Sequence, residues 1–401
     1  MFKTSLDKFT SINRIAVISD SALGFGSPDI IGLADGLCAH FGAKGILVQP
    51  DDLNRPLVDI NFTADVRSVR LFSDLPTYTR SWRWNFFRLA ARAVDEFKPD
   101  IVVVVGPNGY GASRALRHRP KLLVYYMLEM ATTEPLYADL HKHYGNADID
   151  AYIIPDIERH NIDFGNLHWR KDVDFEGIYL TAPINYPVPI KPRAADDRNG
   201  KSIYFGHIHP EETLLDNMLT PQLNDCEIEF FGRIGDADRG VIANRIASTP
   251  GKAYRGLQTP EDLADTLPRF NFSLVTWKPE GHIGRFHLPA TKLYHSVLAG
   301  VPIIAVPNPL NVYFIRKLGI GLLMDGWSRR SFIESIQAAK AMIGSDAYRS
   351  MVDRCRVAAE GEFAWSRQVS RCAALVERAL EKKWRRLYGP RKSQPALAAN
   401  G

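Results

Sequence analysis

The segment at residues 287–305 combines residue types that are typical of an anion-binding site. A proline and Thr291 begin a short predicted helix, Lys292 lies in its first turn, and an apolar strand follows. The first N–H groups of a helix have no partner within the helix and carry the positive end of its dipole, so they favour a phosphate. The sequence therefore predicts that Lys292, Thr291 and the backbone at Ala290 bind a phosphate group.

The rest of the chain supplies alternating strands and helices that must position this segment. Strands separated by helices predict an α/β fold with parallel, doubly wound sheets. A proline-rich stretch at residues 182–200 divides the alternation into two halves and is typical of an interdomain linker. We expect strands at residues 14–19, 45–48, 66–71, 98–106, 122–126, 151–154, 177–180, 202–206, 227–232, 272–277, 303–306 and 320–324, and helices at 29–40, 82–97, 211–219, from 259, 289–300, from 310 and onward to about 386.

Length and composition limit the class of protein. With 401 residues, the chain exceeds the usual size of one hydrophobic core, so two domains are expected. Residues 1–8 lack the apolar stretch of a signal peptide, and the longest branched aliphatic run, residues 101–105, is too short to cross a bilayer. The four cysteines have neither metal-type nor disulfide-type spacing. We therefore expect a cytoplasmic protein, and its net charge of +5 does not indicate a nucleic-acid partner.

A resemblance to a known family rests on the Gly24-x-Gly26 loop after the first strand and on short motifs at residues 254–256, 259–264, 271–275, 292–302 and 363–365. The chain resembles the glycosyltransferase-B (GT-B) fold, and within it bacterial exopolysaccharide transferases such as the xanthan glucuronosyltransferase. The resemblance implies two Rossmann-like, doubly wound α/β domains facing across a cleft, with a C-terminal helix that returns to the N-terminal domain. The resemblance also implies the divisions of the chain: an acceptor domain at 1–190, a nucleotide-sugar domain at 191–365, a crossover helix at 366–390 and a disordered tail at 391–401.

This resemblance implies a metal-independent glycosyltransferase that needs no cofactor. We expect it to move a hexosyl or glycuronosyl group from a nucleotide sugar to a glycan or polyprenyl-linked acceptor, in exopolysaccharide or cell-surface glycan synthesis. Such a transfer requires charge neutralisation on the departing diphosphate, for which Lys292 is the first candidate. The residues assigned to the donor are Lys292, His295, Thr291, Ala290, Arg233, Arg285, Gly206 and His207, with Gly24 and Gly26 in the acceptor or phosphate loop.

The donor segment departs from the family pattern at two positions. Many retaining members carry two glutamates eight residues apart there, and the second holds the donor ribose. In this chain the corresponding residues are His287 and His295. Histidine can hydrogen-bond a ribose hydroxyl but does not replace a carboxylate. The departure argues against the commonest retaining subfamily.

An inverting transfer also requires a base that deprotonates the acceptor hydroxyl. Glu129 follows the strand at residues 122–126 at its carboxyl end, where inverting members of the resembled family place an acid. A partly desolvated carboxylate in a cleft could accept this proton. We therefore expect Glu129 to be catalytic and the transfer to be inverting, with Glu134 as the rival and an ordinary loop glutamate as the alternative.

Histidines near the donor segment keep other chemistries open. His207 and His209 lie two apart with Glu211 and Glu212 behind them, a spacing that could hold a metal, although the resemblance predicts none. A sugar-nucleotide epimerase or hydrolase of the same fold would also use histidines around the donor sugar. A non-catalytic two-lobe binding protein is the third reading.

Basic residues gather at residues 80–88, 114–121 and 382–392. They indicate either solvated helix faces or an anionic membrane surface contacted by a peripheral protein, at the inner face of the membrane. In the first cluster, helical spacing predicts that Trp82 and Phe86 face the core, with Leu89, Ala93 and Phe97. Trp84 and Phe87 fall off that stripe and are the surplus apolar residues.

Overall fold

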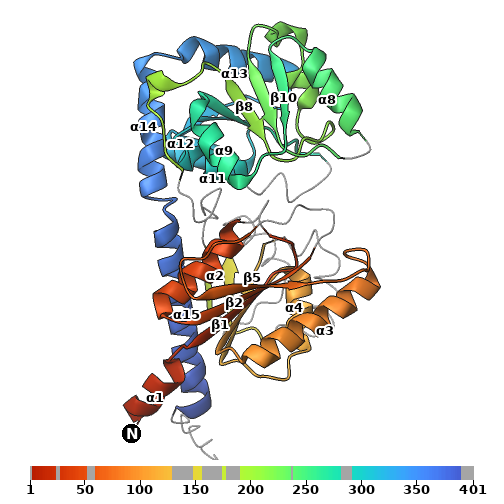
Figure 1. Ribbon diagram of the computed structural model, residues 1–401. Coiled ribbons are helices and arrows are strands. Elements are labelled where there is room, and N and C mark those ends of the chain that lie inside the picture. The colour runs from red at the N-terminus through yellow and green to blue at the C-terminus, as the bar shows by residue number, and fades with distance from the viewer. Residues whose placement is uncertain are drawn as a thin grey trace, which may run out of the picture.

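The computed structural model describes residues 2–23, 28–51, 59–128, 148–155, 174–177, 190–235, 238–280 and 291–389. These residues form two parallel sheets in two lobes, each with its own helices and hydrophobic core (Figure 1). The predicted α/β class with two Rossmann-like halves is therefore confirmed. Among the described residues, no helix is both long enough and apolar enough to cross a membrane.

The first lobe is built on a seven-stranded parallel sheet. Its strand order reverses between β1 and β4, which is the arrangement of a doubly wound Rossmann-like sheet. In spatial order the strands are β3 (Val66–Leu71), β2 (Lys44–Pro50), β1 (Arg14–Ile18), β4 (Ile101–Val105), β5 (Leu122–Tyr126), β6 (Ala151–Ile154) and β7 (Asp174–Gly177). Its helices are α1 (Phe2–Thr10), α2 (Pro28–Phe41), α3 (Arg80–Phe97) and α4 (Gly106–Arg114).

Both faces of this sheet are buried, because side chains along each strand alternate between two cores. In β1, Ile15 and Val17 join the core beneath α2, whereas Ala16 and Ile18 join the core beneath α3 and α4. This explains why the strands read as continuous apolar runs rather than as an alternating pattern.

The second lobe repeats the architecture with a six-stranded parallel sheet whose order reverses between β8 and β11. The strands in spatial order are β10 (Lys252–Gly256), β9 (Ile228–Phe231), β8 (Ser202–Phe205), β11 (Phe272–Val275), β12 (Ile303–Ala305) and β13 (Gly321–Leu323). The helices are α7 (Leu215–Met218), α8 (Arg239–Ser248), α9 (Pro260–Thr266), α11 (Thr291–Leu298), α12 (Pro309–Leu318), α13 (Arg329–Met342) and α14 (Asp346–Glu360), with short 3₁₀ turns at Ala195–Asp197, Pro221–Leu223 and Leu267–Arg269.

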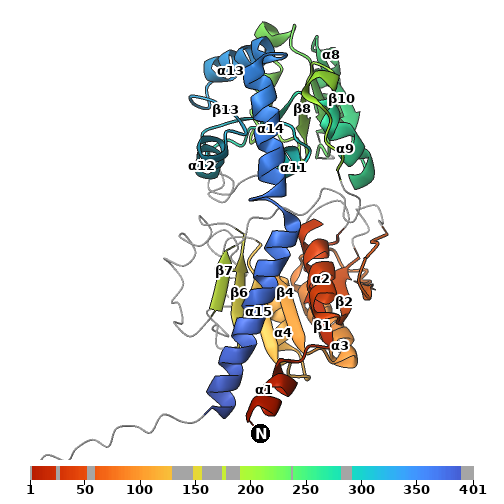
Figure 2. The same cartoon turned by 90° about the vertical axis from the view of Figure 1, so that its left-hand side faces the viewer.

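The last helix, α15 (Trp365–Tyr388), follows the second lobe in sequence but packs on the first (Figures 1 and 2). Its buried face joins the core beneath α2, through Cys372, Leu375 and Leu380 among others. Gly36 of α2 allows close approach, because a Cβ there would lie 2.7 Å from Val369 Cγ2. The implied C-terminal helix that returns to the N-terminal domain is therefore confirmed.

Three local expectations need correction. The helix expected at 211–219 is described as helical only at α7. Of the strand expected at 177–180, Gly177 is the last residue of β7, and residues 178–180 lie outside the described residues. Helix α4 was not expected, because the sequence Gly-Pro-Asn-Gly is typical of a turn. Phe87 is buried, at 8% exposure, because the buried face of α3 is wider than a single stripe; Trp84 is 60% exposed, as expected for a surplus residue.

Candidate functional site: a buried lysine at the edge of the second sheet

The reversal of strand order between β8 and β11 defines where a ligand is expected in the second lobe. In doubly wound sheets, ligands bind beyond the carboxyl ends of the strands at this point. The chain leaves β8 at Gly206 and leaves β11 toward Trp277, and α11 begins nearby at Thr291. Figures 1 and 2 show α11 on the side of the second lobe that faces the first.

Lys292 is the most unusual residue at this edge, because its charged end is buried. The residue is 6% exposed, and its Nζ has no hydrogen-bond partner in the described structure. Nζ lies 3.9 Å from the ring centroid of Tyr204 and 5.0 Å from that of Trp277. The faces of aromatic rings attract a cation, but they do not replace the hydrogen bonds that an ammonium makes in water.

Burial lowers the pKa of Lys292 from 10.5 to about 7. Loss of water around the ammonium disfavours its charged form, so Lys292 releases its proton more readily than an exposed lysine does. A bound anion would supply the missing partner and restore the charge.

This pKa predicts opposite pH effects on folding and on binding. Raising the pH from about 7 to about 10 is expected to increase the free energy of unfolding, because the unfolded chain keeps the Lys292 proton that the folded chain has released. Affinity for a diphosphate is expected to fall over the same range, because binding requires the charged form. Urea unfolding and nucleotide titration across this range, compared with Lys292→Met, measure both slopes. Slopes that are identical in the two proteins would contradict the assignment.

His295 lies one turn after Lys292 on the same buried face of α11. It is 8% exposed, and its ring stacks on Phe205 with centroids 6.4 Å apart and an interplanar angle of 13°. Burial lowers the pKa of His295 to about 3, so the imidazole is neutral at physiological pH. A neutral imidazole can donate or accept one hydrogen bond but cannot neutralise a phosphate, which leaves Lys292 as the buried cation of this helix.

Two glycines bring the loops after β8 and β9 into direct contact. Gly206 has φ 104° and Gly232 has φ 130°, both in the region that favours glycine. A Cβ on Gly232 would lie 1.9 Å from the carbonyl oxygen of Gly206, so the two backbones touch. A Cβ on Gly206 would lie 3.9 Å from Lys292 Nζ, so the Gly206 backbone borders the buried ammonium.

The loop after β8 continues with two histidines. His207 is exposed, and its carbonyl oxygen accepts a hydrogen bond of 2.8 Å from the Tyr204 hydroxyl. The His207 and His209 rings lie 5.7 Å apart, and His209 Nδ1 is 4.0 Å from Glu212 Oε2. Among the described residues, no group of three acidic, histidine or cysteine side chains could hold a metal ion. Arg233 is exposed directly after Gly232, beside the same loops.

The structure thus brings together Lys292, Gly206 and the aromatic pair Tyr204 and Trp277, and it places Arg233 and His207 on neighbouring loops. Sequence reasoning missed the aromatic pair. Its only signal was an aromatic residue near the end of each of the two strands that flank the reversal. The predicted residues Glu129, Gly24, Gly26, Ala290 and Arg285 lie outside the described residues.

The equivalent edge of the first sheet carries a buried carboxylate that the sequence analysis did not single out. Asp20 follows β1 and is 8% exposed. Its Oδ2 accepts hydrogen bonds from the Asn108 backbone N–H at 3.3 Å and from Nδ2 at 3.2 Å, in the first turn of α4. Gly106, with φ 69°, has room only for a hydrogen, because a Cβ would lie 2.5 Å from the same oxygen. These contacts join the end of β1 to the first turn of α4, so Asp20 fixes the position of that helix.

Comparison with known proteins identifies the fold. No protein-family model matches the sequence, and a search of curated proteins finds no match. Among solved structures, sucrose-phosphate synthase from Thermosynechococcus elongatus has a TM-score of 0.65 at 13% identity, over 94% of this chain and 99% of that one. HepE from Anabaena, in complex with UDP and glucose, has a TM-score of 0.65 at 10% identity, over 90% and 99%. WaaG, a glycosyltransferase involved in lipopolysaccharide biosynthesis, has a TM-score of 0.62 at 11% identity over the same shares.

These likenesses span nearly the whole length of each solved protein, so they concern the complete two-lobe architecture. They agree with the two Rossmann-like sheets and with the helix that crosses back from the second lobe to the first. The chain therefore has the GT-B fold of glycosyltransferases.

Proposed function

We propose that this protein transfers a hexosyl or glycuronosyl group from a nucleotide sugar to a glycan or lipid-linked acceptor. The observation that carries the proposal is the buried, unpartnered ammonium of Lys292 at the strand reversal of the second sheet. A buried cation without a partner is costly, and a protein keeps one where a ligand supplies the opposite charge. The GT-B fold and the donor-type segment around α11 support the same substrate class.

A nucleoside diphosphate fits this position by its charge. The leaving group of a nucleotide sugar is a diphosphate that gains negative charge as the bond to the sugar breaks. Protonated Lys292 would stabilise that charge, with backbone N–H groups at the start of α11 and the Gly206 backbone beside it. Arg233 and Arg285 are the proposed secondary cations. The structurally similar HepE was solved with UDP and with UDP-glucose, which favours a uridine nucleotide as the first ligand to test.

The reaction that we propose is inverting and needs no metal ion. The acceptor hydroxyl oxygen forms the new bond to the anomeric carbon, the bond from that carbon to the diphosphate oxygen breaks, and a base takes the hydroxyl proton. Glu129 is the proposed base. Lys292 performs the charge neutralisation that a divalent cation would otherwise supply.

The proposed setting is the synthesis of an exopolysaccharide or a cell-surface glycan, at the inner face of a membrane that the protein touches peripherally. A lipid-linked acceptor would require such contact. The basic clusters of the first lobe and of the C-terminal helix support an anionic surface as the partner.

A thermal-shift screen of nucleoside diphosphates and their sugars tests the proposed donor class. A ligand that binds only the folded state stabilises it by mass action and so raises the unfolding temperature. At a ligand concentration of about one hundred times the dissociation constant, the free energy of unfolding increases by about 2.7 kcal/mol. We expect UDP to raise it, and UDP sugars to raise it further if the sugar is also bound. No shift with any uridine, guanosine, adenosine or cytidine diphosphate would overturn the proposal.

Release of nucleoside diphosphate from the bound nucleotide sugar distinguishes transfer from the other chemistries. Release that depends on an added glycan or polyprenyl-linked acceptor supports transfer. Release into water at the same rate without acceptor supports a hydrolase. Binding without any turnover, under all acceptors, supports a two-lobe binding protein.

A further inference from the structure

Helix α3 presents a face to solvent that its role in the core does not explain. Arg80, Trp84, Arg88 and Arg92 recur every four residues and are all exposed, while Trp82 on the opposite side is 1% exposed. Of the large apolar side chains of α3, Trp84 is the exposed one, at 60%. An exposed tryptophan beside arginine side chains suits a membrane interface, where the indole lies among the headgroups and the guanidinium groups meet lipid phosphates.

A groove of about 1030 Å³ runs between α3 and α4 beside this face, and Trp84 and Phe87 form part of its wall. Arg88, Lys98 and Arg117 also line it, and all three are exposed. In the described part of the chain, no carboxylate forms an ion pair with any of these three cations; Arg88 donates only to the amide oxygen of Asn85, at 3.1 Å.

The two carboxylates that line the groove, Asp95 and Glu96, already have partners. Asp95 accepts hydrogen bonds from the backbone N–H groups of Arg117 at 3.0 Å and of His118 at 2.8 Å. Glu96 pairs with Arg92 at 2.9 Å. The groove therefore offers unpaired positive charge next to an exposed indole.

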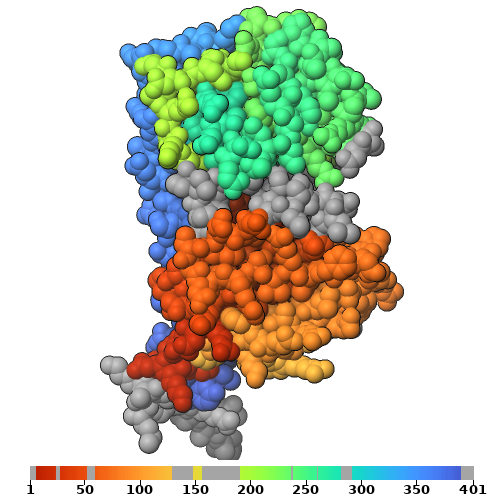
Figure 3. Space-filling model, viewed as in Figure 1, coloured from red at the N-terminus to blue at the C-terminus, as the bar shows by residue number. Residues whose placement is uncertain are grey.

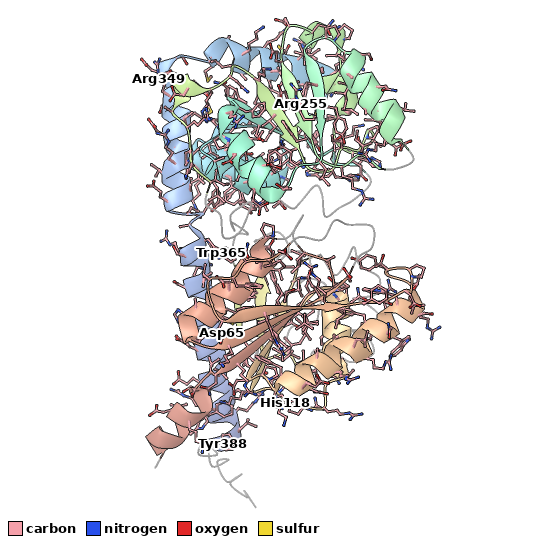
Figure 4. The ribbon with its side chains drawn as sticks, viewed as in Figure 1. Asp65, His118, Arg255, Arg349, Trp365 and Tyr388 are labelled. Carbon is pink, nitrogen blue, oxygen red and sulfur yellow. The ribbon has the colours of Figure 1, made fainter. Side chains whose placement is uncertain are left out.

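The groove lies at the lower end of the first lobe (Figure 1). Helix α1 and the end of α15 lie at the same end (Figures 1 and 2), so they could contact the same flat surface as the groove. Figure 1 places α3 along the lower outer side of the first lobe, Figure 3 shows that side as an orange surface, and Figure 4 labels His118 and Tyr388 at the lower end of the same lobe. Lys121 Nζ donates to the Ser11 carbonyl at 2.7 Å, which ties the loop to the end of α1. Phe9 of α1 packs against Tyr388, which is 58% exposed at the end of α15.

We infer that the α3–α4 face is the surface by which the protein docks on an anionic lipid bilayer, with lipid phosphates in the groove and Trp84 in the interface. The inference rests on the membrane association proposed above and names the residues that perform it. A bilayer fits better than a nucleic acid, because base stacking requires successive aromatic platforms and α3 exposes a single one. Each unpaired Lys or Arg near an anionic surface contributes about a fivefold gain in partitioning.

Sedimentation of the full chain with phosphatidylcholine vesicles that do or do not contain phosphatidylglycerol tests the inference. We expect binding only to the anionic vesicles, with loss of binding as salt rises from about 0.05 M to about 0.5 M. The double variant Arg88→Glu/Arg117→Glu should bind about 25-fold more weakly or worse. The matched control Arg239→Glu/Arg329→Glu makes the same change in net charge at exposed first-turn positions of α8 and α13 in the second lobe, and it should bind as the unchanged protein does.

A second pair of variants separates insertion from charge. Trp84→Ser should weaken vesicle binding and abolish the blue shift of tryptophan fluorescence that anionic vesicles cause. Val241→Ser, at a residue of the second lobe with 73% exposure, should change neither. Both Glu variants should retain the UDP thermal shift, which shows that they are folded.

The outcomes distinguish the assignment of the α3–α4 face from the more general proposal that the protein associates with a membrane. If the unchanged protein ignores anionic vesicles, the membrane association itself is wrong. If it binds them but the α3 variants and their second-lobe controls bind equally well, the association stands and the assigned face is wrong. If vesicle binding is absent while polyuridylate binds and the double variant loses it, the groove is a nucleic-acid surface and the inference is overturned.

Discussion

Replacement of Lys292 by methionine is expected to reduce nucleoside-diphosphate binding by about 100-fold while leaving the folded state as stable as before, or more so. Hydrogen bonds to a charged group contribute about 1.5–3 kcal/mol each, and a diphosphate would make at least one with this ammonium. Methionine keeps most of the side-chain volume between Tyr204 and Trp277 but removes a buried charge that has no partner in the ligand-free protein. Isothermal titration with UDP measures the first effect, and urea unfolding measures the second.

The opposite changes in binding and stability make this prediction specific. If Lys292 merely packed the core, its replacement would lower the affinity for the nucleotide and the free energy of unfolding together. Lys340→Met is the matched control, because Lys340 is an exposed lysine of the same lobe that pairs with Asp225 at 2.7 Å, and its loss should leave UDP binding unchanged. Unaltered UDP affinity in Lys292→Met would remove Lys292 from the donor site.

Replacement of Gly232 by alanine is expected to be among the most destabilising single changes in the second lobe, on the order of 3 kcal/mol or more. The added Cβ would meet the Gly206 carbonyl oxygen at 1.9 Å. The backbone fixes the positions of both atoms, so no side-chain rotation relieves the clash. The φ of 130° adds strain that alanine cannot avoid. Because Gly206 borders Lys292, separating the two loops should also weaken nucleotide binding.

Gly235→Ala provides the control for this change. It lies three residues further along the same chain, where an added Cβ would meet nothing within 4 Å. Chemical denaturation of both variants measures the difference in the free energy of unfolding. If Gly232→Ala and Gly235→Ala unfold at the same denaturant concentration, the close contact of the two loops does not exist in solution.

The strands and most helices were predictable because their signals are local. The continuous apolar run at β4 predicted a strand buried on both faces, and Thr259 followed by Pro260 predicted the start of α9. Thr259 does accept a hydrogen bond from the backbone N–H of Asp262 at 3.1 Å, as its position before the helix predicted. These residues act on neighbours within four positions, and the sequence contains those neighbours.

Helix α4 and Phe87 were missed because their state depends on distant residues. Asn108, in the first turn of α4, donates two hydrogen bonds to Asp20, which lies more than eighty residues earlier, and Gly106 leaves room for that carboxylate. Phe87 is buried against Gly111 of α4, whose missing side chain makes room for the ring. Neither contact has a signal within the segment itself.

By itself, the sequence determined the order of the elements, their division into two α/β halves and the position of Lys292 at the start of a helix before a strand. Local propensity and periodicity carry that information. Only the tertiary structure decided which strands lie at the reversal of each sheet. It also decided the chemistry of Lys292, because the pKa of an ammonium depends on what surrounds it. Tyr204 comes from β8 and Trp277 from the segment after β11, and their packing removes the water that would have kept this lysine an ordinary surface cation.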